Sequence, residues 1–289
     1  MATETAETRK SVWDRLQDID PKIIYGIMLI AVFLPLIRPL GVPIGNINPE
    51  VTNLYNYLNS LPAGSIIVHD CEISPIYMAE CYPCFVAFLN EHVQRSFKVI
   101  MFTQDTTALP AIEKGITEVY GKTKDHPNYG KTFVNLGFLP GSTLGLNAFA
   151  ADNLFPVLDA YGNKLADMQF FKEMADKSAR SWRLVVGYGS GGVGYLVQQI
   201  TDVYPNCKTS SGTAAVAIPS HYAYYPNKII GFLGGLTGAA QFEYLIGKPG
   251  IAIAGMDAQS LASLAIAVLI VVGNVAYFAA RRTKAVRGG

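Results

Sequence analysis

Acidic and amide side chains stand at or just beyond the ends of short apolar runs in this sequence. Asp70 ends one such run, Asp105 closely follows a second, and Asn135 lies in a third. Two neighbouring carboxylates can bind a hard cation or act as acid and base. The same side chains can instead cap the helices that follow them. The sequence alone leaves both interpretations open.

A glycine-rich segment over residues 187–194 follows a further apolar run and precedes a helical pattern. The spacing of Gly187, Gly189 and Gly192 matches the dinucleotide-binding fingerprint, and backbone N–H groups at the start of a helix favour anions. The acidic residue expected about twenty positions later is missing, because Cys207 and Lys208 stand there. The pattern therefore favours a tight strand-to-helix turn, with a small-anion or cofactor site as the alternative.

Four cysteines indicate three alternative kinds of chemistry. Cys81 and Cys84 have the spacing of redox motifs, although a low thiol pKa in such motifs needs a helix N-terminus directly after a strand. In an oxidising compartment a structural disulfide among Cys71, Cys81, Cys84 and Cys207 is favoured, and three full pairings are open. His69 with the first three cysteines could instead hold zinc, but at an irregular spacing. We expect no resident metal and assign no cofactor.

Small residues recur one helical turn apart in the segment 228–250, where the pairs are Gly231/Gly235 and Gly234/Gly238. This spacing lets the backbones of two helices pack closely. It predicts a glycine-rich helix that lies at the membrane surface or at a contact between subunits. A homo-oligomer contact is the favoured interpretation, and packing within the chain is the alternative.

Alternating strands and helices are expected to position these side chains. Short apolar runs bounded by turn residues predict buried strands, over residues 64–70, 97–102, 131–137, 182–186 and 209–217. Helical patterns separate most of them, over residues 74–94, 109–122 and 194–203. Such alternation predicts right-handed βαβ units and a mainly parallel sheet covered on both faces. We therefore expect an α/β, three-layer, Rossmann-like domain over residues 45–227.

The carboxyl ends of parallel strands meet at one edge of the sheet, where ligands of such folds bind. That edge is expected to bring Asp70, Asp105, Asn135 and the segment 187–194 into one neighbourhood.

Two apolar stretches predict membrane spans. Residues 261–280 are uncharged and end at Arg281 and Arg282, and about twenty such residues cross the ~30 Å hydrocarbon core as a helix. They predict a span over 259–280. A second stretch, followed by Arg38 and further apolar residues, predicts a span over 23–44.

Basic residues predict the orientation in the cell membrane. Four of them precede the first stretch and four follow the last. Because positive charges stay inside, the tails 1–22 and 281–289 are expected in the cytoplasm and the domain between them outside it. The net charge of +1 offers no basic field for nucleic acid. With 50% hydrophobic and 16% charged residues, the composition suits one domain with two spans better than a many-pass transporter.

Several longer segments occur together in one order, among them YGKTFVNLGFLPG, GTAAVAIPSHYAYYPNKIIGFLGGLTGAAQFEYL and GMDAQSLASLAIAVLIVVGNVAY. With the opening WDRLQDIDPKIIY they resemble a family of uncharacterised prokaryotic membrane-anchored proteins. The resemblance implies terminal spans on both sides of a Rossmann-like domain. It marks residues 231–243 and 255–274 as characteristic segments and supplies no activity.

Three functional hypotheses follow from the sequence. The first is a membrane-anchored, non-enzymatic protein that assembles into a homo-oligomer with a structural or scaffolding role. The second is a membrane-bound enzyme or ligand-binding protein with its site at Asp70, Asp105 and residues 187–194. The third is a thiol-disulfide oxidoreductase that uses Cys81 and Cys84.

Overall fold

The computed structural model describes residues 12–41, 45–191 and 193–287. The chain divides into two units. One comprises residues 43–253, and the other joins the residues up to 42 to those from 254 onward.

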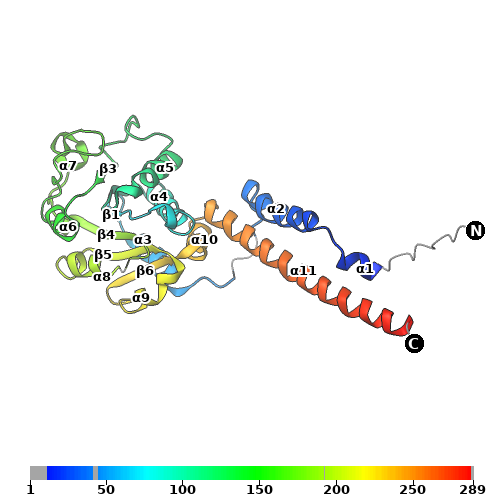
Figure 1. Cartoon of the computed structure of the whole chain (residues 1–289). Helices are drawn as coiled ribbons and strands as arrows, with labels where there is room; N and C mark the ends of the chain where they lie inside the picture. Colours follow the sequence, from blue (N-terminus) through cyan, green and yellow to red (C-terminus); the bar gives the residue numbers. More distant parts are fainter. Residues whose placement is uncertain (1–11, 42–44, 192, 288–289) are drawn as a thin grey trace, which may run out of the picture. The chain divides into compact units, whose positions relative to one another are not determined.

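Residues 43–253 form an α/β unit on an all-parallel sheet (Figure 1). The six strands of the described chain are β1 (Ile66–Asp70), β2 (Lys98–Thr103), β3 (Phe133–Phe138), β4 (Trp182–Gly189), β5 (Lys208–Thr213) and β6 (Ile229–Gly234). Their order is β3-β2-β1-β4-β5-β6, the order of dinucleotide-binding α/β folds. The predicted α/β class with a mainly parallel sheet is confirmed.

Helices cover both faces of this sheet (Figure 1). One face carries α3 (Pro49–Ser60), α4 (Cys81–Arg95), α5 (Leu109–Tyr120) and α10 (Gly235–Leu245). The other carries α6 (Ser142–Ala151), α7 (Gln169–Lys172), α8 (Gly194–Leu196), the π-helical turn η5 (Val197–Thr201) and α9 (Ile218–Tyr222). Two apolar layers result, as expected for a parallel sheet buried on both sides.

The core explains why these segments became strands. All five residues of β1 are buried, because the strand lies in the middle of the sheet with a helical layer on either side. On the face of α6, the rings of Phe149 and Trp182 lie 5.1 Å apart between their centroids. On the face of α4, Phe85 and Phe88 pack against His69 of β1.

The segment 228–250, predicted as one glycine-rich helix, forms strand β6 followed by helix α10, so only its second half is helical. A Cβ atom built on Gly231 would lie 2.2 Å from the carbonyl oxygen of Glu50 in α3. Cβ atoms on Gly234, Gly235 and Gly238 would lie 2.6, 3.1 and 2.9 Å from other atoms of the same chain. The four glycines thus serve packing within the chain, and a contact between subunits stays a prediction.

The C-terminal helix α11 (Ile251–Arg287) contains the predicted span 259–280. Its segment Ile251–Arg282 is long and apolar enough to cross a membrane. Large apolar side chains such as Leu264, Val271 and Tyr277 are exposed along it, which is what lipid contact requires.

The N-terminal apolar helix is shorter than predicted. After the short helix α1 (Val12–Gln17), helix α2 (Pro21–Ile37) has 17 residues and so is roughly 26 Å long. It ends there because Arg38 precedes Pro39, and a residue before proline prefers the extended conformation that Arg38 adopts. Beyond Pro39, the N–H groups of Leu40 and Gly41 donate to Asp257 Oδ2, at 2.6 and 2.8 Å.

A second membrane span over 23–44 is therefore not shown by the structure. Residues 42–44 of that prediction lie outside the described residues, as do residues 1–11 and 288–289 of the two predicted tails.

Candidate ligand site at the carboxyl edge of the sheet

The strand order reverses between β1 and β4. After β1 the chain enters α4 on one face of the sheet, and after β4 it enters α8 on the other. Ligands of open α/β sheets bind at such a switch point, outside the carboxyl ends of the strands.

Asp70 is the last residue of β1 and is fully buried at this switch point. The hydroxyl group of Tyr195, in α8, donates a hydrogen bond to Asp70 Oδ2. Asp70 Oδ1 is also buried but has no hydrogen-bond partner in the described chain. Burial raises the pKa of Asp70 to about 8; the charge of Glu72 adds to the rise, and the hydrogen bond from Tyr195 opposes it.

Ser211 lies on the same face of the sheet as Asp70. Asp70 pairs in register with Gly187 of β4, and Gly187 pairs with Ser211 of β5. Ser211 Oγ is buried and, like Asp70 Oδ1, has no partner in the described chain. Gly187 has no side chain, and Leu196 of α8 covers the face between the two groups, since a Cβ atom on Gly187 would lie 2.6 Å from Leu196 Cδ1.

A cavity of about 10 Å³ lies beside these strands, with room for about one water-sized group. Glu72, Tyr195, Ser211 and His221 supply polar side chains to its wall. The Nδ1 atom of His221 is 3.0 Å from the carbonyl oxygen of Ala217, which assigns the ring proton to Nδ1. Burial lowers the pKa of His221. Burial also raises the pKa of Glu72, and the charge of Asp105 adds to this rise.

The described residues of the glycine-rich segment are not arranged as a phosphate-binding turn. Gly187 and Gly189 belong to strand β4, and a Cβ atom on Gly187 would lie 2.6 Å from Leu196 Cδ1. Gly189 has a φ of +111°, and a Cβ atom there would lie 3.1 Å from the carbonyl oxygen of Glu72. Gly192 lies outside the described residues.

The chain beyond this segment also lacks a regular helix to bind an anion, because α8 has three residues and continues as the π-helical turn η5. A Cβ atom on Gly191 would lie 3.8 Å from Glu72 Oε2, so a bound phosphate would meet a carboxylate. This geometry favours the tight turn over the dinucleotide site.

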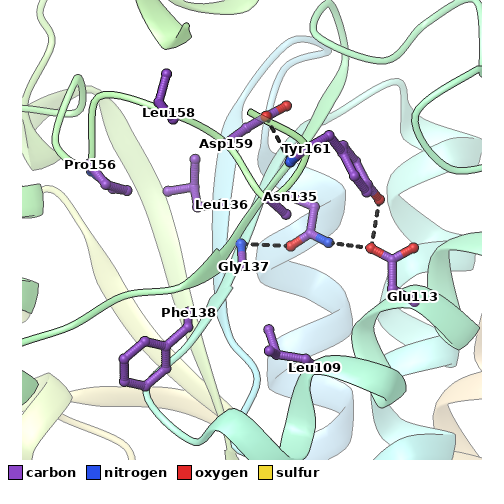
Figure 2. A pocket seen from close by; sticks show the side chains of 11 residues that line it. Leu109, Glu113, Asn135, Leu136, Gly137, Phe138, Pro156, Leu158, Asp159 and Tyr161 are labelled. Carbon is purple, nitrogen blue, oxygen red and sulfur yellow. Dashed lines mark hydrogen bonds between the residues drawn. The ribbon is translucent and has the colours of Figure 1, made fainter. Parts of the chain in front are cut away.

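Neither Asp105 nor Asn135 shares a hydrogen-bond partner with Asp70 in the described chain. Asp105 Oδ1 accepts hydrogen bonds from the N–H and hydroxyl groups of Thr107, so it caps the 3₁₀ turn η2 (Thr106–Ala108). Asn135 Nδ2 donates to Glu113 Oε1 at 2.8 Å, and Asn135 Oδ1 accepts from the N–H of Gly137 (Figure 2). Asn135 therefore lines a separate cavity beside β3.

The cysteines support neither a disulfide nor a redox centre. All four are buried free thiols. Burial raises the pKa of Cys81 to about 12 and that of Cys84 well above its usual range, which suppresses the reactive thiolate. In the described chain, no three His, Cys, Asp or Glu side chains are placed to hold a metal ion. His69 instead contacts Tyr188 and His92, each at 2.8 Å.

Tyr195, Ser211 and His221 were not among the site residues predicted from the sequence. The sequence held one signal for Ser211. The buried strand β5 reads Lys-Thr-Ser-Ser-Gly-Thr, whereas a strand buried in a parallel sheet is usually rich in apolar residues. The other two enter the site through the short helices α8 and α9.

Fold and side chains together define an α/β protein with a buried polar site at the switch point of a parallel sheet and a C-terminal helix suited to a membrane. No family model, curated protein or solved structure matches the chain. The resemblance to membrane-anchored proteins therefore stays an expectation.

Proposed function

We propose that this protein is a membrane-anchored ligand-binding protein that holds a small neutral polar molecule at the carboxyl ends of β1, β4 and β5. One observation carries the proposal: Asp70 Oδ1 and Ser211 Oγ are buried, lie on one face of the sheet, and lack partners in the described chain. An unsatisfied buried polar group costs about 1–3 kcal/mol. A polar ligand at this edge of the sheet removes that cost at each of these groups to which it bonds.

The distribution of such atoms supports this location. In the described chain, four side chains have a buried polar atom without a partner, namely those of Asp70, His92, Gln104 and Ser211. Three of the four lie near the carboxyl ends of β1, β2 and β5, where ligands of this fold class bind.

The charges around the cavity select for a neutral ligand. Glu72 lies in the wall, and no Lys or Arg lines the cavity within the described residues. Because its pKa is about 8, Asp70 is mostly protonated at neutral pH and can donate a hydrogen bond. The cavity, whose wall includes Ser211 and not Asp70, has room for about one hydroxyl, carbonyl or amide group of the ligand.

Membrane anchoring by two spans is part of the proposal. Helix α2 exposes Ile30, Phe33 and Ile37, among other apolar side chains that lipid would cover. The hydrogen bonds from Leu40 and Gly41 to Asp257 tie the end of this segment to α11. Basic residues in both tails support a location of the α/β unit outside the cytoplasm. A membrane-impermeant reagent should then label cysteines introduced in the α/β unit of intact cells and spare those introduced in either tail.

Thermal melting of the full-length protein in detergent tests the ligand. Glucose and uridine are compared with glucose 6-phosphate and uridine monophosphate, for wild type and for Ser211→Ala. We expect a neutral compound to raise the melting temperature of wild type more than its phosphorylated counterpart, and Ser211→Ala to abolish the difference. A larger effect of the phosphates, or an equal effect on both proteins, would contradict the proposal.

A homo-oligomeric scaffolding role remains the alternative prediction. It is tested by measuring the mass of the detergent-solubilised particle, and a strict monomer would exclude it.

A further inference from the structure

A second cavity, of about 400 Å³, lies beside the carboxyl end of β3 (Figure 2). Helix α5 contributes Leu109 and Glu113, strand β3 contributes residues 135–138, and the loop 156–161 forms the rest of the wall. No lining residue is shared with the cavity beside β4 and β5. The volume lies within the range of small-molecule sites.

Asp159 holds the loop of this cavity in place. Its Oδ1 atom accepts hydrogen bonds from the N–H groups of Tyr161 and Asn163, at 2.9 and 2.7 Å. Its Oδ2 atom accepts from the hydroxyl group of Tyr129 and from Asn163 Nδ2, at 2.8 and 3.0 Å. With both oxygens occupied, this carboxylate has a structural role.

Glu113 is held differently. Its Oε1 atom accepts from Asn135 Nδ2 at 2.8 Å and from the hydroxyl group of Tyr161 at 2.6 Å (Figure 2). Both donors are neutral, and within the described chain no Lys or Arg forms an ion pair with Glu113. The carboxylate is thus fixed in orientation while its charge is not compensated by a cation. A charged donor would form a stronger hydrogen bond here than a neutral one.

The remaining wall is apolar. Leu136, Phe138, Pro156 and Leu158 line it, and Phe138 and Leu158 are 41% and 46% exposed. The cavity therefore offers one ligand both an apolar surface and the oriented carboxylate of Glu113.

We propose that this cavity binds a small amphipathic amine. The ammonium group donates to Glu113, and the apolar body packs against Phe138 and Leu158. This site is independent of the proposed site at Asp70 and Ser211.

Binding of 2-phenylethylamine and of its neutral analogue 2-phenylethanol to the full-length protein in lipid nanodiscs tests the proposal, with calorimetry as the measurement. Wild type should bind the amine, and Glu113→Gln should weaken that binding by at least about tenfold without affecting the alcohol. Glutamine keeps an oxygen that accepts from Asn135 and Tyr161, so the wall stays intact, and an unchanged melting temperature verifies this.

Glu173→Gln is the matched control, because it removes one exposed carboxylate that does not line the cavity. It should leave amine binding unchanged, and the same nanodiscs account for partition of the probes into lipid. Equal binding of amine and alcohol to wild type, equal amine binding to wild type and Glu113→Gln, or no binding of the amine to wild type would each overturn the proposal. None of these results bears on the ligand at Asp70, since the two cavities share no residue.

Discussion

Replacing Asp70 with Asn should change how the stability of the α/β unit depends on pH. Burial raises the pKa of Asp70 from 3.8 to about 8. Between these values the folded state keeps a proton that the unfolded state releases, so stability falls as pH rises through this window. The slope is about 1.4 kcal/mol per pH unit, and it flattens as the pH approaches the folded pKa. From pH 6.5 to pH 8 the loss is therefore about 2 kcal/mol.

His69 and His92 contribute with the opposite sign. Burial lowers the pKa of His92 from 6.5 to about 3. Burial, together with the neighbouring His92, lowers the pKa of His69 well below 6.5. Below pH 6.5 the unfolded state binds protons that the folded state does not, so stability falls as pH falls.

Urea unfolding of the full-length protein in detergent, followed by the fluorescence of the buried Trp182 in a Trp13→Phe background, measures this profile. Above pH 6.5, wild type should lose about 2 kcal/mol that Asp70→Asn keeps. Below pH 6.5, down to about pH 4, wild type should lose less stability on acidification than Asp70→Asn, by about 1.4 kcal/mol per pH unit. Glu72 and Glu243, whose pKa values burial also raises, are present in both proteins and cancel in the difference. Parallel curves above pH 6.5 would show that Asp70 is already ionised when folded and would refute the reasoning.

Three further predictions concern individual residues. Ser211→Ala should raise the stability of the unliganded protein by about 1–2 kcal/mol in the same assay, because it removes a buried hydroxyl without a partner; a loss would show that the hydroxyl is already bonded. Gly231→Ala should destabilise by about 1–3 kcal/mol, because the new methyl group meets the Glu50 carbonyl oxygen. Gly273→Ala, with nothing within 4 Å of its Cβ position, is the control, and equal melting of the two variants would contradict the packing of β6 on α3. Maleimide at pH 8 should label Cys81 and Cys84 slowly until the protein is unfolded, because burial raises both pKa values; fast labelling of the native protein would restore the redox hypothesis.

The sequence predicted β1 to β5 because each is a short run of suitable residues between turn residues. It missed β6 because a run such as Ile-Ile-Gly-Phe-Leu-Gly fits a strand and a buried helix equally well, and periodicity alone cannot separate them. The strand is favoured by the close packing of α3 on Gly231. No local pattern shows this contact, because it joins residues far apart in the chain.

The sequence predicted where the candidate site lies, but it identified only some of the residues that form it. Asp70 was found because it ends an apolar run, and Asp105 was found for the same reason but serves as a cap. Ser211 depends on the register that β5 adopts beside β4, which no local pattern contains. The predicted span of 23–44 continued past the end of α2 at Ile37, although Arg38 directly before Pro39 was a local signal for that end.

Ser211 differs from the other hydroxyl-bearing residues of β5 in its hydrogen bonding. Thr209 bonds to Thr201 at 2.6 Å, Ser210 donates to the carbonyl oxygen of Gly231 at 2.8 Å, and Thr213 donates to that of Gly189 at 3.0 Å. Each of these buried hydroxyls joins β5 to a neighbouring element, which offsets the cost of burying it. Ser211 makes no such bond in the described chain, although an apolar side chain there would avoid the cost altogether. Its neighbour on the same face, across Gly187, is Asp70, the one other strand residue with an unsatisfied buried atom in the described chain. The two unsatisfied groups are the reason for proposing a polar ligand at this edge of the sheet.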